Sequence, residues 1–207
     1  MLIGVLALQG DFESHEKALE SIGHEAVEIR RPEDAGFANP AAPRESKLKS
    51  MADPEVAMRR VPDGIVLPGG ESSTIDLLGR RYGFQYLIPA FAASGKVIFG
   101  TCAGAIWLGK GVHHKVKPLE LIDVTLERNA YGRQVDSFST PVEIEGLDSP
   151  YQAVFIRAPR ITAIGAEVQV LAEYEGDPIL VRKGNIILST FHPEQTMDYR
   201  VQKLVFG

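Results

Sequence analysis

Short apolar runs alternate with helical patterns in the first half of the chain. Residues 2–8 are apolar throughout and predict a buried strand, and Asp11 is placed to cap an amphipathic helix over residues 12–22 that ends at Gly23. Repeated strand–helix units of this kind favour a parallel sheet with helices on both faces. The other strands expected in this half are 26–30, 64–67 and 97–99, and the other helices are 73–81, 84–94 and one that follows residue 102 and runs through 108.

The second half of the chain is richer in strand patterns. Turns containing Gly, Pro or Asp separate its apolar runs, and a final helix is predicted over residues 199–206. The whole pattern predicts an α/β fold of three layers (α/β/α) with a mixed, mostly parallel central sheet. The strands expected here are 122–128, 142–144, 154–156, 168–174, 179–182 and 186–190.

Residues 35–62 do not fit this alternation. They contain four prolines and mixed charge, and they are longer than a usual connection in a compact domain. We interpret them as a surface insertion within a single domain that spans residues 1–207. Asp53-Pro54-Glu55 could begin a short helix that runs to Arg60.

Composition limits the classes of function. Lys and Arg total 22 and Asp and Glu total 27, so the net charge of −5 argues against a nucleic-acid-binding surface. The first residues lack the basic segment of a secretory signal, and no apolar run approaches the ~20 residues that span a bilayer. We therefore expect a cytoplasmic protein without a membrane segment.

The single cysteine, Cys102, lies in Gly100-Thr101-Cys102-Ala103-Gly104, directly after an apolar strand and before a helix. This is the G-x-nucleophile-x-G arrangement, in which glycines permit a sharp turn that exposes the central side chain. The N-terminus of the following helix would favour the thiolate form. Spacing alone leaves a second interpretation open, in which Cys102 packs as a small buried hydrophobe.

A cysteine nucleophile needs a base, and His192 is the candidate among five histidines. It follows an apolar strand and precedes Pro193-Glu194, so Glu194 could accept the imidazole N–H and fix the tautomer. A purely structural role for His192 is equally open at this point. His15 and His24 are predicted to be surface residues, and the pair His113-His114 would need further ligands to hold a metal.

The loop Pro68-Gly69-Gly70-Glu71 follows another predicted strand. Two glycines there allow backbone N–H groups to point at an oxyanion or a ligand carboxylate. A phosphate-binding loop would require a Lys-Ser/Thr pair after its glycines, and none is present. A simple strand-to-helix turn remains the alternative.

Together these elements resemble a class I glutamine amidotransferase, whose fold is flavodoxin-like. Further motifs make the chain similar to the glutaminase subunits of pyridoxal 5′-phosphate synthases, over nearly all of its length except about 35–62. The motifs that carry the resemblance are Gly100–Gly104, Pro68–Glu71, His192–Glu194, Leu6–Asp11, Glu127–Gln134 with Ser137-Phe138, and Phe155–Pro159.

The resemblance implies that Cys102, His192 and Glu194 hydrolyse L-glutamine to glutamate and ammonia through a thioester. It implies oxyanion donors at Gly70 and Ala103, no metal or organic cofactor, and a hetero-oligomer in which ammonia passes to a synthase subunit. Docking on that subunit would act on the oxyanion site near Gln9-Gly10-Asp11. The glutamine-binding residues implied are Gly69, Gly70, Glu71, Arg128, Ile156 and Arg157.

Three other assignments remain open. One is the glutaminase subunit of another amidotransferase, such as imidazole glycerol phosphate synthase; the second is a DJ-1-like cysteine hydrolase or sensor; the third is an inactive glutaminase that only binds a partner. The chain also departs from the family pattern. Glu120 stands where glycine is common, Gln195 stands where leucine is usual, and the final helix ends early, at Gly207.

Overall fold

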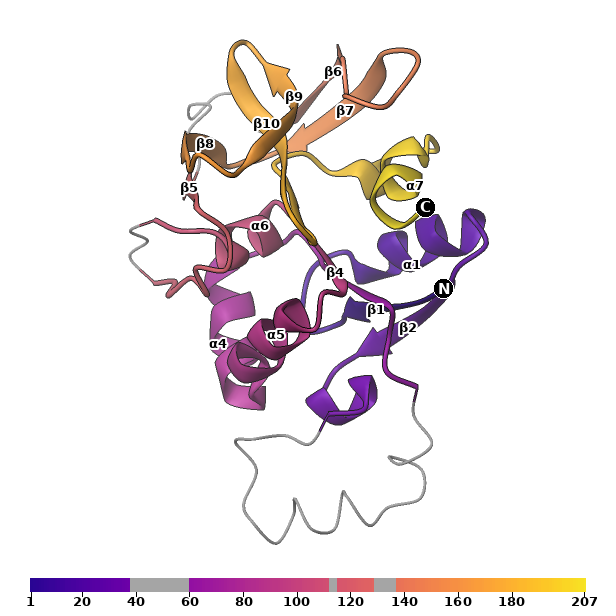
Figure 1. Cartoon of the computed structure of the whole chain (residues 1–207), viewed down its shortest axis with the longest axis vertical. Helices are drawn as coiled ribbons and strands as arrows, with labels where there is room; N and C mark the ends of the chain where they lie inside the picture. Colours follow the sequence, from indigo (N-terminus) through magenta and orange to yellow (C-terminus); the bar gives the residue numbers. More distant parts are fainter. Residues whose placement is uncertain (38–59, 112–114, 129–136) are drawn as a thin grey trace, which may run out of the picture.

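The computed structural model describes residues 1–37, 60–111, 115–128 and 137–207, and a seven-stranded sheet forms its centre (Figure 1). The strand order is β2-β1-β3-β4-β11-β10-β9. Neighbours from β2 to β11 pair in parallel, whereas β10 and β9 add antiparallel strands at one edge. The predicted mixed, mostly parallel sheet is confirmed. The strands are β1 Leu2–Leu6, β2 Glu25–Ile29, β3 Gly64–Leu67, β4 Val97–Thr101, β9 Gln169–Tyr174, β10 Asp177–Lys183 and β11 Ile186–Ser189.

Helices cover both faces of this sheet, as predicted. On β3, Val66 packs in one buried cluster with Leu19 and Phe206, while its neighbours Ile65 and Leu67 pack in the other. Alternate residues of a strand point to opposite faces, so two separate cores result. The first core contains α1 (Phe12–Ser21) and α7 (Arg200–Phe206), and the second contains α4 (Ser72–Tyr82), α5 (Phe84–Ala93) and α6 (Ala103–Leu108).

Two antiparallel pairs lie beyond the central sheet, near β9 and β10 in Figure 1. β5 (Val124–Glu127) pairs with β8 (Arg160–Ile164), and β6 (Ser137–Val142) pairs with β7 (Tyr151–Ile156). The sequence analysis missed β8 and placed a strand at 142–144, whereas β6 ends at Val142. β6 is mostly polar and lacks the apolar signal on which that analysis relied, whereas β8, with the sequence RITAI, carries a short polar–apolar alternation that the analysis did not use.

The register of the sheet brings the candidate chemistry to one edge. Gly100 of β4 lies opposite Leu67 of β3 and opposite Leu188 of β11, so these three strands end at nearly the same level. Ligand sites in open α/β sheets form at the carboxyl ends of such strands. Cys102, the 68–71 loop and His192 therefore converge although they are far apart in sequence.

Several expectations lie outside the described residues. The proposed helix after Asp53, the pair His113-His114 and most of the 127–134 motif fall in 38–59, 112–114 and 129–136. Of the predicted insertion only the ends are described: Ala35, which ends the 3-10 helix Pro32–Ala35, is fully buried, and residues 60–62 lead into β3. Among the described helices, none is long and apolar enough to cross a membrane.

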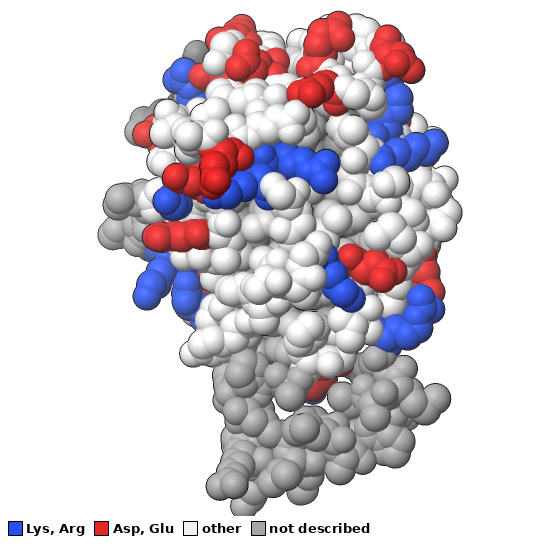
Figure 2. All heavy atoms as spheres, viewed as in Figure 1, with Lys and Arg blue, Asp and Glu red and all other residues white. Residues whose placement is uncertain are grey.

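The face shown in Figure 2 carries acidic and basic side chains close to one another. Acidic side chains gather at the end of the molecule where Figure 1 places β6, β7, β9 and β10. A band of basic side chains on this face lies directly beside acidic ones. Charges of both signs are therefore interspersed here, in a chain whose net charge is −5.

Candidate active site

Cys102 occupies a strained turn between β4 and α6. Its backbone φ is +47° and its ψ is −101°, a conformation that L-residues rarely adopt. Gly104 is required here because a Cβ would stand 2.1 Å from the Leu67 carbonyl oxygen, and a Cβ at Gly100 would stand 2.7 Å from Leu108 Cδ1. The predicted nucleophile elbow is thus present, and the sharp turn places the thiol at the sheet edge.

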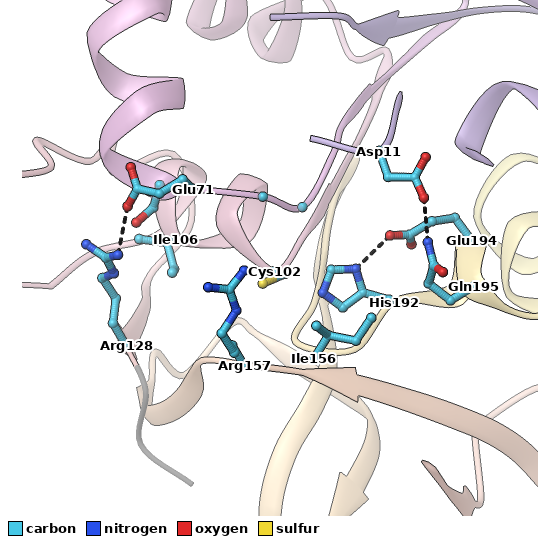
Figure 3. A pocket seen from close by; sticks show the side chains of 13 residues that line it. Asp11, Glu71, Cys102, Ile106, Arg128, Ile156, Arg157, His192, Glu194 and Gln195 are labelled. Carbon is cyan, nitrogen blue, oxygen red and sulfur yellow. Dashed lines mark hydrogen bonds and ion pairs between the residues drawn. The ribbon is translucent and has the colours of Figure 1, made fainter. Parts of the chain in front are cut away.

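The Cys102 thiol lies in the wall of a cavity of about 310 Å³ (Figure 3). The residue is 6% exposed, and its backbone N–H donates to the Ser189 carbonyl oxygen at 2.9 Å. This bond fixes the elbow to the end of β11, the strand that leads to His192. The residues lining the cavity are Asp11, Gly69, Gly70, Glu71, Ser72, Cys102, Ile106, Arg128, Ile156, Arg157, His192, Glu194 and Gln195.

His192 lies between Cys102 and Glu194 (Figure 3). Its Nδ1 is 2.7 Å from Glu194 Oε1, and its backbone N–H donates to the Val154 carbonyl oxygen at 2.8 Å. A carboxylate only accepts hydrogen bonds, so Nδ1 carries a proton and donates a hydrogen bond to Glu194. Both side chains are at least nine-tenths buried, which shields the pair from water.

Two neighbouring side chains determine the protonation of His192. Burial alone lowers the pKa of His192, but the Cys102 sulfur and the Glu194 carboxylate outweigh it and raise that pKa to about 10. Burial likewise raises the pKa of Glu194, yet the neighbouring His15 and His192 bring it below its usual value. At neutral pH His192 is therefore an imidazolium next to an ionised Glu194.

The glycine loop after β3 packs against this pair. A Cβ at Gly69 would stand 2.5 Å from His192 Cε1 and 3.3 Å from the Cβ of Cys102. Gly70 has a φ of +136° and leaves no room for a Cβ beside the Gln9 side chain. Gln9 fixes the loop because its Oε1 accepts from the Glu71 N–H at 2.8 Å and its Nε2 donates to the Gly69 carbonyl at 3.4 Å.

Glu71 and Arg128 face each other across one end of the cavity. Arg128 Nη2 is 2.8 Å from Glu71 Oε1, and Glu71 also caps α4 by accepting from the Thr74 N–H at 2.8 Å. Partial burial raises the pKa of Glu71, but hydrogen bonds from Ser73 and Thr74 outweigh it and lower that pKa to about 2. A full negative and a full positive charge therefore stand side by side, which suits an amino-acid zwitterion.

Ile156 and Arg157 lie at the end of β7, on the same cavity. Arg157 has a φ of +44°, unusual for a residue other than glycine, and Figure 3 shows its side chain extending toward Cys102. Ala103 opens α6, where the first N–H groups have no partner inside the helix. All the residues predicted for catalysis and glutamine binding thus lie together.

The prediction that His15 is a surface residue is wrong. His15 is 1% exposed, and its Nε2 lies 3.2 Å from Thr101 Oγ1 and 3.3 Å from Glu194 Oε2. The missed signal was helical spacing: residues 15, 18 and 19 share the buried face of α1. His24 lies outside that helix and is half-buried, so it too is not fully exposed.

Two departures from the family pattern have visible structural consequences. Gln195 Nε2 donates to Asp11 Oδ2 at 2.6 Å and so connects the segment after His192 to the start of α1. Glu120 has a φ of +55°, a conformation that glycine adopts without strain. No group of three or more His, Cys, Asp or Glu residues that could hold a metal occurs within the four described segments.

An elbow cysteine, a His–Glu pair and a glycine loop at the carboxyl edge of this sheet define a class I glutamine amidotransferase. A model of the SNO glutamine amidotransferase family matches residues 5–206, and the chain belongs to that family. The protein "Pyridoxal 5′-phosphate synthase subunit PdxT" of Fervidobacterium nodosum is 39% identical over 204 residues, which are 98% of this chain and 94% of the relative. The proteins of the same name from Bacillus licheniformis and Thermus thermophilus are 41% and 40% identical, over 99% and 98% of this chain and 92% and 94% of theirs.

Solved structures agree with this assignment. A crystal structure described as a glutamine amidotransferase superposes with a TM-score of 0.80 at 39% identity, covering 98% of this chain and 96% of that one. The PurLQS structure from Thermotoga maritima has a TM-score of 0.63 at 17% identity, covering 100% of this chain and 91% of that one. At that lower identity the likeness supports the fold alone.

Proposed function

We propose that this chain is the glutaminase subunit of a pyridoxal 5′-phosphate synthase and releases ammonia from L-glutamine. The observation that carries the proposal is the arrangement of Cys102, His192 and Glu194 on one cavity of a glutamine amidotransferase fold. Full-length relatives at about 40% identity bear the name of that synthase subunit. The whole of residues 1–207 would form one glutaminase domain.

The first chemical step is attack by the Cys102 thiolate on the carboxamide carbon of glutamine. A C–S bond forms, and the π electrons of the carbonyl move onto oxygen to give a tetrahedral intermediate. When this intermediate collapses, the C–N bond breaks and His192 gives its proton to the departing nitrogen, so ammonia leaves. The product on the enzyme is a γ-glutamyl thioester.

The second step is hydrolysis of that thioester. His192, now neutral, takes a proton from water as the oxygen attacks the acyl carbon. The C–S bond breaks, glutamate leaves, and the thiolate–imidazolium pair is restored. Glu194 holds the imidazole through Nδ1 in both steps and stabilises its positive charge.

The surrounding groups bind the substrate and stabilise its charge. The N–H groups of Ala103 and Gly70 would donate to the oxyanion, and losing one such donor typically costs roughly 3–4 kcal/mol of barrier. Arg128 would bind the α-carboxylate and Glu71 the amino group, exchanging part of their mutual contact for the substrate. Gly69, Ile156 and Arg157 would complete the pocket.

Ammonia is useful only when it reaches an acceptor before water dilutes it. The partner we propose is therefore a synthase subunit that receives ammonia within a hetero-oligomer, in the cytoplasm. The reaction uses neither a metal nor an organic cofactor on this chain. Contact with the synthase near Gln9, which holds the 68–71 loop, would couple docking to the oxyanion site.

The test is an assay of ammonia and glutamate release from glutamine, with and without a cognate synthase subunit. We expect activity in the complex, none with Cys102→Ala, and formation of pyridoxal 5′-phosphate when pentose and triose phosphates are supplied. A complex without glutaminase activity, or an alanine variant that keeps it, would contradict the proposal. Peroxide-sensitive Cys102 without glutamine turnover would instead support a DJ-1-like sensor.

The alternatives have less support. An imidazole glycerol phosphate synthase glutaminase would share the triad, but the full-length relatives at about 40% identity carry the pyridoxal phosphate name. An inactive binding subunit would have no need of the strained Cys102 backbone or of a buried Glu194 directed at His192.

A further inference from the structure

One buried titratable side chain beside the triad has no part in the chemistry described above. His15 projects from α1, and its Nε2 lies 3.3 Å from Glu194 Oε2. The side chains of both residues are 1% exposed. Neither side chain is therefore in contact with bulk solvent.

The two oxygens of Glu194 have different neighbours. Oε1 accepts from His192 Nδ1 at 2.7 Å, whereas Oε2 has no hydrogen-bond partner within the described segments and has His15 Nε2 3.3 Å away. A buried carboxylate is costly unless polar groups stabilise its charge. His15 Nε2 is placed to stabilise the charge on the second oxygen.

The protonation state of His15 follows from these neighbours. Burial is the largest influence on the pKa of His15 and lowers it, so the ring is neutral at neutral pH. Since a carboxylate only accepts, the tautomer that stabilises Oε2 has the ring proton on Nε2, which lies 3.3 Å from that oxygen. Thr101 Oγ1, 3.2 Å from the same nitrogen, adds a contact to the residue just before Cys102.

We propose that His15 is a positioning residue that fixes the ionised Glu194 from the side opposite His192. Four side chains then lie in a row in the order His15, Glu194, His192 and Cys102. His15 belongs to α1, His192 and Glu194 follow β11, and Cys102 follows β4. His15 does not touch the substrate; it acts through the orientation and charge of Glu194. This role deepens the proposed glutaminase function and rests on it.

The charged groups around this unit are few. Asp11 and His192 act on His15 besides Glu194, and His15 and His192 act on Glu194. Cys102 acts on His192 from its other side. When an apolar residue replaces His15, Glu194 loses the polar group beside Oε2 and takes up a proton at higher pH, which ends its support of His192.

The experiment compares His15→Leu with His15→Gln in the complex with the synthase subunit. Leucine fills the space without a donor, whereas the glutamine Nε2 can reach the position of the histidine Nε2. We expect His15→Leu to lower kcat by at least about tenfold with KM nearly unchanged, the effect of about 1.4 kcal/mol on the barrier. Its acidic limb of kcat/KM should move to higher pH, and His15→Gln should remain within about threefold of the unaltered enzyme.

Controls separate the possible failures. His24→Leu, which changes a histidine that contacts the N-terminus rather than Glu194, should leave kcat unchanged. If His15→Leu does not fold, His15→Met carries the same prediction. Two outcomes would overturn the role of His15, provided that the unaltered complex is active. In the first, the leucine or methionine variant keeps the kcat and the pH profile of the unaltered enzyme. In the second, the glutamine variant folds but is as impaired as the leucine variant. An unaltered complex without glutaminase activity contradicts the proposed function instead.

Discussion

The α-carbon of Gly69 lies against the imidazole of His192, so closely that a Cβ at position 69 would stand 2.5 Å from Cε1. Non-bonded carbon atoms in proteins do not approach this closely, so any side chain at position 69 must displace the ring or the loop. The loop proposed to bind the oxyanion is therefore fitted closely to His192, the proposed catalytic base.

Gly69→Ala should accordingly lower kcat of the complex by about 100-fold or more, because a displacement near 1 Å can cost that much in a positioned site. The measurement is steady-state glutaminase activity together with thermal unfolding. Gly95→Ala is the control, since position 95 has open space and only its φ of +77° makes the change costly. The Gly95→Ala variant should lose some stability and keep kcat. Equal activity of the two alanine variants would contradict the close packing of Gly69 against His192.

The protonation of His192 can be measured directly. An NMR titration of the imidazole should show a charged ring at pH 8 and a midpoint at a pKa of about 10. Cys102→Ala should lower that midpoint because it removes the sulfur, one of the two neighbours that raise the pKa of His192. A midpoint near the ordinary value of 6.5 in the unaltered chain would refute the ion pair.

The same raised pKa of His192 has a consequence for stability. The unfolded chain binds the proton more weakly than the folded one, so the stabilisation is fully present below about pH 6.5. It declines as the pH rises and is lost through about pH 10. We would measure the free energy of unfolding in urea for the unaltered chain and for His192→Asn. The difference between the two should shrink as the pH rises from about 6.5 to about 10, because the contribution of the charged histidine is lost.

Arg128→Gln should raise KM for glutamine by about tenfold or more and lower kcat less, because its guanidinium would bind a carboxylate that is present in both ground and transition states. Steady-state kinetics of the complex measure this split. Arg60→Gln is a matched control, since Arg60 forms an exposed pair with Glu25 outside the cavity. A fall in kcat at constant KM would assign Arg128 to the chemistry rather than to binding.

Asp76 stabilises the helices behind the elbow. Its carboxylate accepts from Trp107 Nε1 at 3.0 Å, from Arg80 Nε at 2.7 Å and from the Lys117 N–H at 3.0 Å. Asp76→Leu should destabilise the chain by about 2–4 kcal/mol because it leaves buried donors unsatisfied. Urea unfolding tests this value, and Glu173→Ala on the exposed surface of β9 should change the stability by no more than about 0.5 kcal/mol.

The sequence by itself determined the sheet, the helices and the main chemical groups. Apolar runs and glycines are local signals that can be read from the sequence. Because β3, β4 and β11 pair in parallel, their carboxyl ends lie at the same edge of the sheet. Strand ends and spacing singled out Cys102, His192 and Glu194 as candidates, and the family resemblance gave them their proposed roles. Strand β8 was missed although its sequence, RITAI, alternates polar and apolar residues over Arg160–Ala163.

Only the tertiary structure decided which groups meet. His15 and Glu194 are separated by most of the chain, and nothing local in either segment indicates that α1 brings a histidine to the second oxygen of a carboxylate. The same holds for the Glu71–Arg128 pair and for the Gln9 side chain that fixes the glycine loop. Burial and partners depend on how helices pack across the sheet, and packing is a property of the whole chain rather than of any motif.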